Sequence, residues 1–145
     1  SYIYVGDEKI SGTLIECDLQ GKRVSNCIMG VGININQTVF RSDAPNPTSL
    51  KLLTGREHDR EEILSLLLNH FQHYYTQLQE GHEEAIRQLY MQYLYRREGF
   101  HRYRDVRGEF MAELADVEPT GHLRLRFADG NVVRYELKEV QFVKD

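Results

Sequence analysis

The sequence predicts an α+β protein: a partial mixed or antiparallel sheet with helices over residues 1–100, followed by a small β-barrel over residues 101–145. Three patterns support this prediction. Strand-like segments with internal glycines fill residues 1–35, apolar residues at helical spacing fill the middle of the chain, and every segment beyond residue 105 alternates with a period of two. A module of about 40 residues is small for an independent core, so we expect the barrel to lean on the first domain.

The N-terminal strands are expected to form an antiparallel three-stranded meander. The turn residues Gly6-Asp7-Glu8 separate strands at 3–5 and 10–17, and they leave Lys9 at the rim of the sheet. A second turn leads to a third strand, which runs from residue 24 to about residue 35.

Three glycines fall inside these strands, where glycine is unfavourable unless a ligand or another backbone comes close. If Gly12, Gly30 and Gly32 share one face, they leave a groove floored by backbone, in which N–H groups can meet a flat ligand. The alternative is a bulge or packing against a helix.

Cys17 and Cys27 are the only cysteines, and they fall on adjacent predicted strands, where they could lie near each other. Because they lack C-x-x-C spacing in a protein with a cytosolic composition, we expect buried thiols rather than a disulfide. His70 and His73 share a helix face without a Cys or acidic partner at ligand spacing, which disfavours a metal site.

A polar loop over 37–46 precedes a short helix expected over 47–54. Asn46 can cap this helix, Pro47 suits its first position and Gly55 can close it. The loop carries Arg41, Ser42 and Asp43.

The backbone N–H groups near Thr48 and Ser49 would then lie at the positive end of the helix, where a phosphate or carboxylate can bind. A capped helix start that binds nothing is the simpler interpretation from these residues alone.

Two amphipathic helices follow. Asp59-Arg-Glu-Glu62 matches a capping box and Gly81 ends the first helix, while the second is expected over 83–96. Both should bury an apolar stripe, and the aromatic residues in it favour packing over base stacking. The stripe comprises Ile63, Leu66, Leu67, Phe71, Tyr74, Tyr75 and Leu78, then Ile86, Leu89, Tyr90, Tyr93 and Leu94.

The C-terminal part predicts strands at 106–117, 123–127 and 132–142, separated by turns at 118–121 and 128–131. Leu123, Leu125 and Phe127 should lie on one face, with Arg124 and Arg126 on the other. Before these strands, five arginines could hold a phosphate-bearing partner, but they alternate with acidic residues, which favours a solvated linker. The arginines are Arg96, Arg97, Arg102, Arg104 and Arg107, and the acidic residues are Glu98, Asp105 and Glu109.

Composition is that of an ordinary globular protein, with 41% hydrophobic and 28% charged residues. No apolar run approaches the roughly 20 residues of a membrane helix, and the chain opens without a basic or apolar leader, so we expect a cytoplasmic protein. The net charge of −4 disfavours a nucleic-acid surface.

Three motifs follow one another in the N-terminal half: Lys9-Ile-Ser-Gly-Thr-Leu-Ile-Glu16, Gly30-Val-Gly-Ile-Asn-Ile-Asn36 and Ala44-Pro-Asn-Pro-Thr-Ser-Leu50. In order and spacing they resemble the second half of the biotin protein ligase family, biotin-[acetyl-CoA-carboxylase] ligase, and the resemblance covers essentially the whole chain. It implies a truncated class II synthetase-like catalytic domain followed by an SH3-like β-barrel.

Two motifs of the family are absent from this chain. One is the Gly-Arg-Gly-rich loop for biotin and phosphate, and the other is Lys-Trp-Pro-Asn-Asp, whose Asn-Asp would fall at Ser1 and Tyr2. The resemblance therefore implies a C-terminal fragment of a ligase, inactive alone. An exposed sheet edge at 2–5 is expected to make this fragment self-associate.

The implied reaction joins the biotin carboxylate to ATP, which gives biotinyl-5′-adenylate and pyrophosphate. Biotin then passes to one lysine of the biotin carboxyl carrier domain of a biotin-dependent carboxylase. Two anions must meet, so such a site needs positive charge, Mg²⁺ and backbone donors. By resemblance Lys9 is the catalytic residue, placed against the biotin carboxylate and the adenylate phosphate; taken alone, it is a solvated turn lysine.

The resemblance also implies the other contacts. Biotin is expected to lie against Lys9, Gly12, Leu14, Gly30 and Ile33. ATP is expected to lie against Gly32, Asn34, Thr48 and Ser49, with Asn34 facing the phosphates or Mg²⁺.

Two alternatives stay open. The chain could be a non-catalytic SH3-like interaction module that binds peptide, or RNA through Arg124, Arg126 and Arg134. It could also be a relative of lipoate ligases, which share the catalytic fold, although Gly30-Val-Gly-Ile-Asn34 and the terminal barrel suit biotin better. For the ligase, neither a membrane nor a nucleic acid is an expected partner of this part.

Overall fold

The computed structural model describes residues 1–41, 44–136 and 138–144. The chain forms two compact units, Ser1–His73 and Tyr74–Asp145. Their division falls within helix α2 (Arg60–Gln79), whereas the sequence places a domain boundary at residue 100. The assignment of a catalytic domain and a barrel domain to either side of residue 100 stays a prediction.

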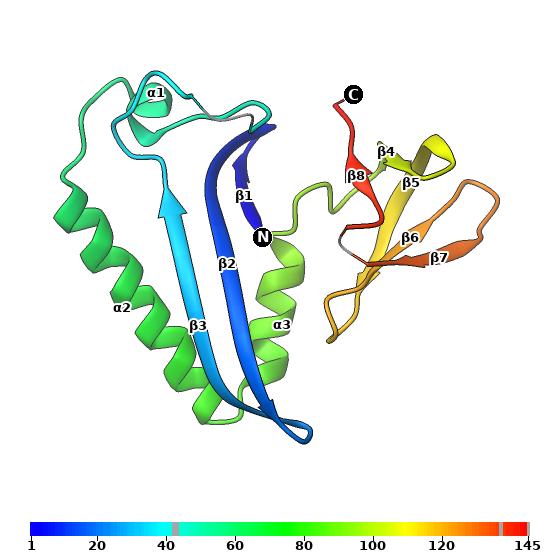
Figure 1. The fold of residues 1–145 in the computed structure, drawn as a ribbon, viewed down its shortest axis with the longest axis horizontal. Coiled ribbons are helices and arrows are strands. Elements are labelled where there is room, and N and C mark those ends of the chain that lie inside the picture. The colour runs from blue at the N-terminus through cyan, green and yellow to red at the C-terminus, as the bar shows by residue number, and fades with distance from the viewer. Residues whose placement is uncertain (42–43, 137, 145) are drawn as a thin grey trace. The chain divides into compact units, whose positions relative to one another are not determined.

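The first unit is built on an antiparallel three-stranded sheet in the order β1 (Tyr2–Val5), β2 (Glu8–Gln20), β3 (Arg23–Ile33). Figure 1 shows β2 and β3 as a long hairpin, which extends well beyond the short β1. Gly21 has a left-handed φ of 62°, which lets the chain reverse tightly between β2 and β3. The predicted meander is confirmed.

Helix α1 (Leu50–Thr54) starts later than the predicted Pro47. Its N-cap is Ser49, whose Oγ accepts a hydrogen bond from the backbone N of Leu52 at 3.2 Å, and not Asn46. Gly55 closes the helix as predicted, in the left-handed conformation. Ser42 and Asp43 of the preceding loop lie outside the described residues.

Helices α2 and α3 (Glu83–Gln92) confirm the two predicted helices, although α3 ends before the expected residue 96. The Asp59 carboxylate accepts a hydrogen bond from Glu61 N at 2.9 Å, which fits its predicted capping role. The expectation that both helices bury an apolar stripe holds only in part: neither contains a fully buried residue, but Met91 and Leu94 pack against the core of the second unit. Leu66 and Phe71 are each 48% exposed, and Tyr93 is 78% exposed. No helix in the described part of the chain is both long and apolar enough to span a membrane.

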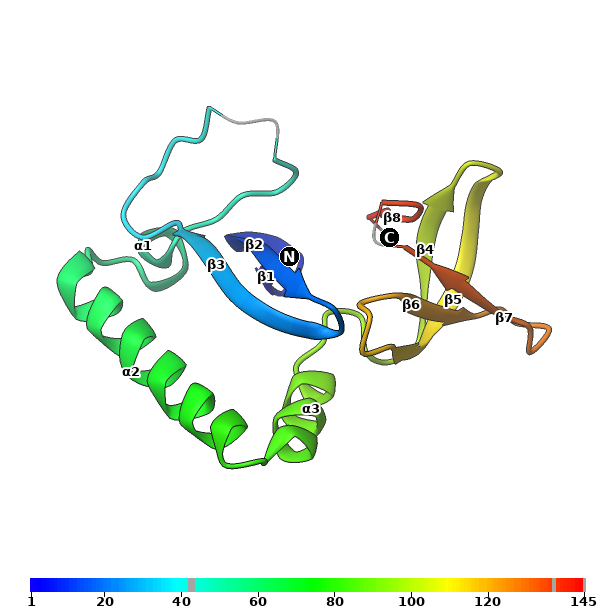
Figure 2. The same cartoon turned by 60° about the horizontal axis from the view of Figure 1, so that its bottom comes forward.

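The second unit contains an antiparallel sheet in the order β7-β6-β5-β4-β8 (Figure 2). Its strands are β4 (Phe100–Asp105), β5 (Gly108–Val117), β6 (Leu123–Arg126), β7 (Val132–Tyr135) and β8 (Gln141–Phe142). Strand β4 lies in the segment that was predicted to be a solvated linker. The predicted strand over 132–142 is divided into β7 and β8. Leu137, between them, is outside the described residues. Among the described residues no pairing joins β7 to β8, so closure of the sheet into a barrel stays a prediction.

The core of the second unit lies on one face of this sheet. Leu125 and Ala112 are fully buried and Tyr103 nearly so, and Met91 and Leu94 pack against them. Leu123 is also buried, while the alternating Arg124 and Arg126 are exposed, as the sequence predicts. The predicted linker arginines form ion pairs with neighbouring carboxylates: Arg97 with Glu98, Arg104 with Glu109 and Arg107 with Asp105.

A polar cluster closes one end of this core. The Asp105 side chain is 4% exposed, and its Oδ2 accepts hydrogen bonds from Arg107 Nη2 at 2.7 Å and from the Tyr135 hydroxyl at 3.0 Å. Arg107 Nη2 also donates to the Tyr135 oxygen at 3.1 Å. These bonds, chiefly the one from Arg107, lower the pKa of the Asp105 carboxyl, while burial raises the pKa of Tyr135.

We expect Asp105→Asn to lower the melting temperature at pH 7 by a few degrees, because the ionised carboxylate is the acceptor that Arg107 and Tyr135 share. A carboxyl whose folded pKa is lowered stabilises the fold above its unfolded pKa of about 3.9 and loses that contribution as pH falls through the folded value. The difference between wild type and variant should therefore stay constant from about pH 7 to about pH 5 and shrink below about pH 4. Calorimetry across this range measures it.

The matched control is Glu16→Gln, which removes an exposed carboxylate from β2 and should leave the melting temperature unchanged. If the difference for Asp105→Asn does not shrink in acid, the carboxylate charge is not what stabilises the cluster.

Candidate functional site

The start of β2 is joined to a distant segment of the chain at the point where β3 ends. Lys9 N donates a hydrogen bond to Asn46 O at 2.8 Å, and Thr48 N donates to Lys9 O at 2.9 Å. Lys9 and Pro47 therefore form a parallel bridge. This pairing uses the residues that the sequence assigned to the start of a helix, which explains why α1 begins only at Leu50.

The end of β3 joins the same segment. Asn34 N donates to Ile10 O at 2.9 Å, Leu50 N donates to Asn34 O at 3.1 Å, and Lys51 N donates to Ile35 O at 2.9 Å. We call these three hydrogen bonds, together with the two between Lys9 and residues 46–48, the junction. The buried residues of the described first unit all lie in the segments it joins: Ile10, Ser11, Thr48 and Ser49.

The three strand glycines lie on one face of the sheet, as predicted. Gly12 is paired with Gly32, and Leu14 is paired with Gly30, and directly paired residues in an antiparallel sheet point to the same side. A β-carbon at Gly30 would meet nothing within 4 Å, and at Gly32 it would meet only Gly12 O, at 3.9 Å. We call this surface the glycine face.

A β-bulge brings Lys9 to the glycine face. Ser11 pairs with Ile3 and Lys9 pairs with Tyr4, so Ile10 is an extra residue in β2. A β-carbon at Gly12 would lie 3.8 Å from Lys9 Cε and 3.6 Å from the Tyr2 ring. The Lys9 ammonium lies 3.6 Å from the centre of that ring, a cation–π contact that holds the charge beside bare backbone.

A cavity of about 270 Å³ lies at this place. It brings together five of the predicted site residues, Lys9, Gly12, Gly32, Ile33 and Asn34, with Ser11, Phe40, Ala44 and Pro47. The other predicted residues, Leu14, Gly30, Thr48 and Ser49, do not line it. The volume is slightly below the roughly 300–1,000 Å³ of small-molecule pockets.

Thr48 and Ser49 are buried residues in the segment that the junction binds to β2 and β3. Thr48 is 1% exposed and Ser49 is 0% exposed, and the Ser49 hydroxyl caps α1. The N–H groups of Thr48, Leu50 and Lys51 donate within the junction. Several of the N–H donors near the predicted anion-binding helix end are therefore used within the junction, and contact of Thr48 and Ser49 with ATP stays a prediction.

Asn34 is held by a neighbour that the sequence did not single out. Gln37 Nε2 donates to Asn34 Oδ1 at 2.6 Å, and Gln37 Oε1 accepts from Ile35 N at 3.0 Å. One lone pair of the oxygen that would face Mg²⁺ is thus in use. A hollow of about 520 Å³ adjoins, lined by Ile33, Ile35, Asn36, Gln37 and Arg60. Within the described residues no group of three His, Cys, Asp or Glu side chains could hold a metal ion.

Most of the other residues at the site belong to none of the sequence motifs. Tyr2 and Phe40 reach the site only through tertiary contacts, and Gln37 lies in a polar loop. The one available signal was the spacing of Gln37 from Asn34, because amide side chains close to one another in a turn often hydrogen-bond locally. The combination of a fixed ammonium, bare backbone and apolar side chains suits a ligand with an anionic group on a flat apolar body.

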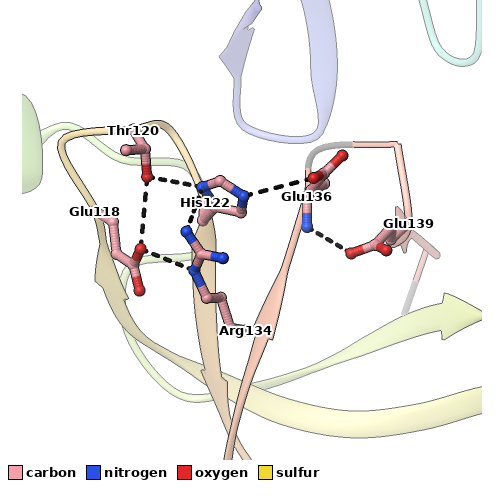
Figure 3. Close-up of polar contacts among 6 residues, drawn as sticks. All are labelled: Glu118, Thr120, His122, Arg134, Glu136 and Glu139. Carbon is pink, nitrogen blue, oxygen red and sulfur yellow. Dashed lines mark hydrogen bonds and ion pairs between the residues drawn. The ribbon is translucent and has the colours of Figure 1, made fainter.

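The arginines of the alternative RNA surface are largely occupied. Arg126 Nη1 contacts Glu113 Oε1 at 3.0 Å, and Arg134 Nε contacts Glu118 Oε2 at 2.9 Å. Arg134 Nη2 also donates to His122 Nδ1 at 3.0 Å, in the cluster drawn in Figure 3. Paired charges are weak sites for phosphates, because the carboxylates must first be displaced. The geometry therefore favours the first unit as the ligand site.

Comparisons with known proteins give a structural match but no sequence match. No protein-family model and no curated protein sequence matches the chain. The apo structure of biotin protein ligase from Aquifex aeolicus superposes with a TM-score of 0.72 at 20% identity, covering 99% of this chain and 62% of that one. The complex of the same ligase with biotin and ATP gives a TM-score of 0.73 at 20% identity, covering 99% and 60%.

At this identity the match shows the fold alone. The protein has an α+β fold similar to part of biotin protein ligase, and it spans about 60% of the length of the solved ligase structures.

The glycine face yields a test that needs no ligand. Neither packing nor a left-handed φ requires glycine at 30, so Gly30→Ala should stabilise the protein by about 0.4–1 kcal/mol through the unfolded state. Urea unfolding measures the change.

Gly21→Ala is the control, because Gly21 has a φ of 62°, and it should destabilise by about 1–2 kcal/mol. If Gly30→Ala costs as much as Gly21→Ala, then glycine at 30 serves the fold and not the approach of a ligand.

Proposed function

We propose that this chain is part of an ATP-dependent ligase that forms biotinyl-5′-adenylate and transfers biotin to a lysine of a biotin carboxyl carrier domain. The observation that carries the proposal is the placement of Lys9 on the glycine face, beside Gly12 and Gly32 at one cavity. The fold similarity to a ligase solved with biotin and ATP supports it. We place the reaction in the cytoplasm.

In this proposal Lys9 lies against the biotin carboxylate and the phosphate that joins it. Its ammonium would stabilise the charge that gathers when carboxylate and phosphate meet, and the cation–π contact with Tyr2 keeps it in place at little entropic cost. The biotin slot would be formed by Gly12, Leu14, Gly30 and Ile33.

The nucleotide would lie against Gly32 and Asn34, with Thr48 and Ser49 supporting them through the junction. Mg²⁺ is usually held by carboxylates together with substrate phosphates. A single amide oxygen that already accepts from Gln37 does not fit a magnesium site, so we assign no magnesium ligand among the residues that the structure describes.

A lysine and one wall cannot exclude water or hold both substrates, so we expect no turnover by this chain alone. In the whole ligase, Lys9→Ala should raise the barrier to adenylate formation by about 2.7–4 kcal/mol. ATP binding should change much less, because the charge matters most in the transition state.

Binding can be tested on the chain itself by NMR, with a non-hydrolysable biotinyl-5′-adenylate analogue as the ligand. We expect amide shifts confined to residues 9–14 and 30–36. Lys9→Ala should weaken binding by roughly 10- to 100-fold, which corresponds to the ~1.5–3 kcal/mol of a hydrogen bond to a charged group.

Lys22→Ala, at the turn of the same hairpin, removes an equal charge and should leave binding unchanged. Two outcomes refute the ligase proposal. Preference for a lipoyl-adenylate analogue points to a lipoate ligase relative, and shifts of Arg124 and Arg126 on adding single-stranded RNA point to an interaction module.

We further propose that this chain self-associates through the first unit. Strand β1 is an edge of its sheet, and the hairpin exposes large apolar side chains, among them Leu14 at 67% and Ile28 at 70%. Such surfaces promote pairing with another copy. Light scattering over a concentration series should show a mass above that of the monomer.

Ile28→Lys should shift this distribution toward the monomer, because a lysine on the exposed face opposes stacking of apolar surfaces. Val106→Lys is the control, since Val106 is 99% exposed but lies singly on a turn of the second unit. A wild-type chain that stays monomeric at all concentrations contradicts the proposal.

A further inference from the structure

The two cysteines, expected to be buried thiols, are both exposed and free. Cys17 and Cys27 are directly paired across β2 and β3, and their sulfur atoms lie 3.1 Å apart. Direct antiparallel pairs have Cα atoms about 4.5–5.5 Å apart, which falls inside the roughly 4.4–6.8 Å that a disulfide requires. A disulfide has an S–S length of about 2.0 Å, so closure needs the two sulfur atoms to approach by about 1 Å.

No buried side chain holds the register of the part of the hairpin that carries these thiols, which depends on the tight turn at Gly21 and on the junction at the other end. From Leu14 to Gln20 in β2 and from Arg23 to Gly32 in β3, every residue is exposed. Register is weakly specified where neither face of a glycine-containing strand is buried, and a slip by one residue turns every side chain to the other face. Such a slip would turn Gly30 and Gly32 away from the glycine face.

We propose that Cys17 and Cys27 are a reversible thiol–disulfide exchange site that reacts with small-molecule disulfides and, when oxidised, locks the register of β2 and β3. This inference does not rest on the ligase proposal, since it follows from the pairing of the two thiols alone.

The exchange balances without a metal or oxygen. The thiolate of one cysteine attacks a sulfur of the small disulfide, which forms a mixed disulfide and releases one thiolate. The second cysteine then attacks the mixed disulfide at the protein sulfur, and the second small thiolate leaves. The protein loses two protons and two electrons, and the small disulfide takes up both and is reduced to two thiols. Exposure of both sulfur atoms gives the reagent access, and their proximity favours the second step over a stable mixed disulfide.

The test uses the whole chain, with oxidised glutathione as the probe, followed by intact mass measurement and alkylation of remaining thiols. We expect a mass loss of about 2 Da, loss of both alkylatable thiols, and full recovery of both on adding dithiothreitol. Hydrogen exchange at the amides of residues 14–31 should slow at least tenfold in the oxidised form.

The matched control keeps two thiols but moves one to the opposite face. Ile28 pairs with Glu16, so the double variant Cys27→Ser with Ile28→Cys places its thiols on opposite sides of the hairpin. This variant should take up glutathione at each cysteine and form no internal disulfide. Glutathione adducts on both wild-type cysteines, a disulfide-linked dimer, or equal internal oxidation of the control would overturn the proposal.

Discussion

Everything at the candidate site depends on the backbone hydrogen bonds that hold Lys9 and Asn34 to residues 46–51. Strand β3 stops at Ile33, so the start of β2 would otherwise have unpaired N–H and C=O groups on that side. The junction satisfies them, buries Thr48 and Ser49, and fixes the bulge that turns Lys9 to the glycine face. These backbone hydrogen bonds therefore complete the hydrogen bonding of the sheet and position both the Lys9 ammonium and the cavity beside it.

The two units reach stability in different ways. The second unit has its own core around Tyr103 and Leu125, closed at one end by the hydrogen bonds of Asp105. The described first unit buries little beyond the junction, and the apolar stripe of α2 stays about half exposed. Because burial contributes about 25 cal/mol per Å² of apolar surface, the exposed apolar side chains of the first unit stabilise its fold much less than they would if they were buried.

Two observations relate this chain to the fold of biotin protein ligase. The motifs around Lys9, Gly30 and Ala44 resemble biotin protein ligase through the order of their residues alone. The superposition on the Aquifex aeolicus enzyme depends on backbone geometry, at an identity too low to carry residue roles. Five of the nine residues that the motifs single out line one cavity of that fold, namely Lys9, Gly12, Gly32, Ile33 and Asn34.

The sequence by itself determined the meander, the helices, the alternation of Leu123 and Arg124, and the common face of Gly12 and Gly32, because period and turn residues are local properties. It could not give the bulge at Ile10, the Tyr2 contact of Lys9 or the pairing of Pro47, since these arise from the pairing between segments and not from the period within one segment. The burial of α2 was predicted wrongly, because an apolar stripe shows which face of a helix tends to be buried but not whether other residues of this chain pack against it. Only the tertiary structure decided that α2 stays open and that Cys17 meets Cys27 in solvent.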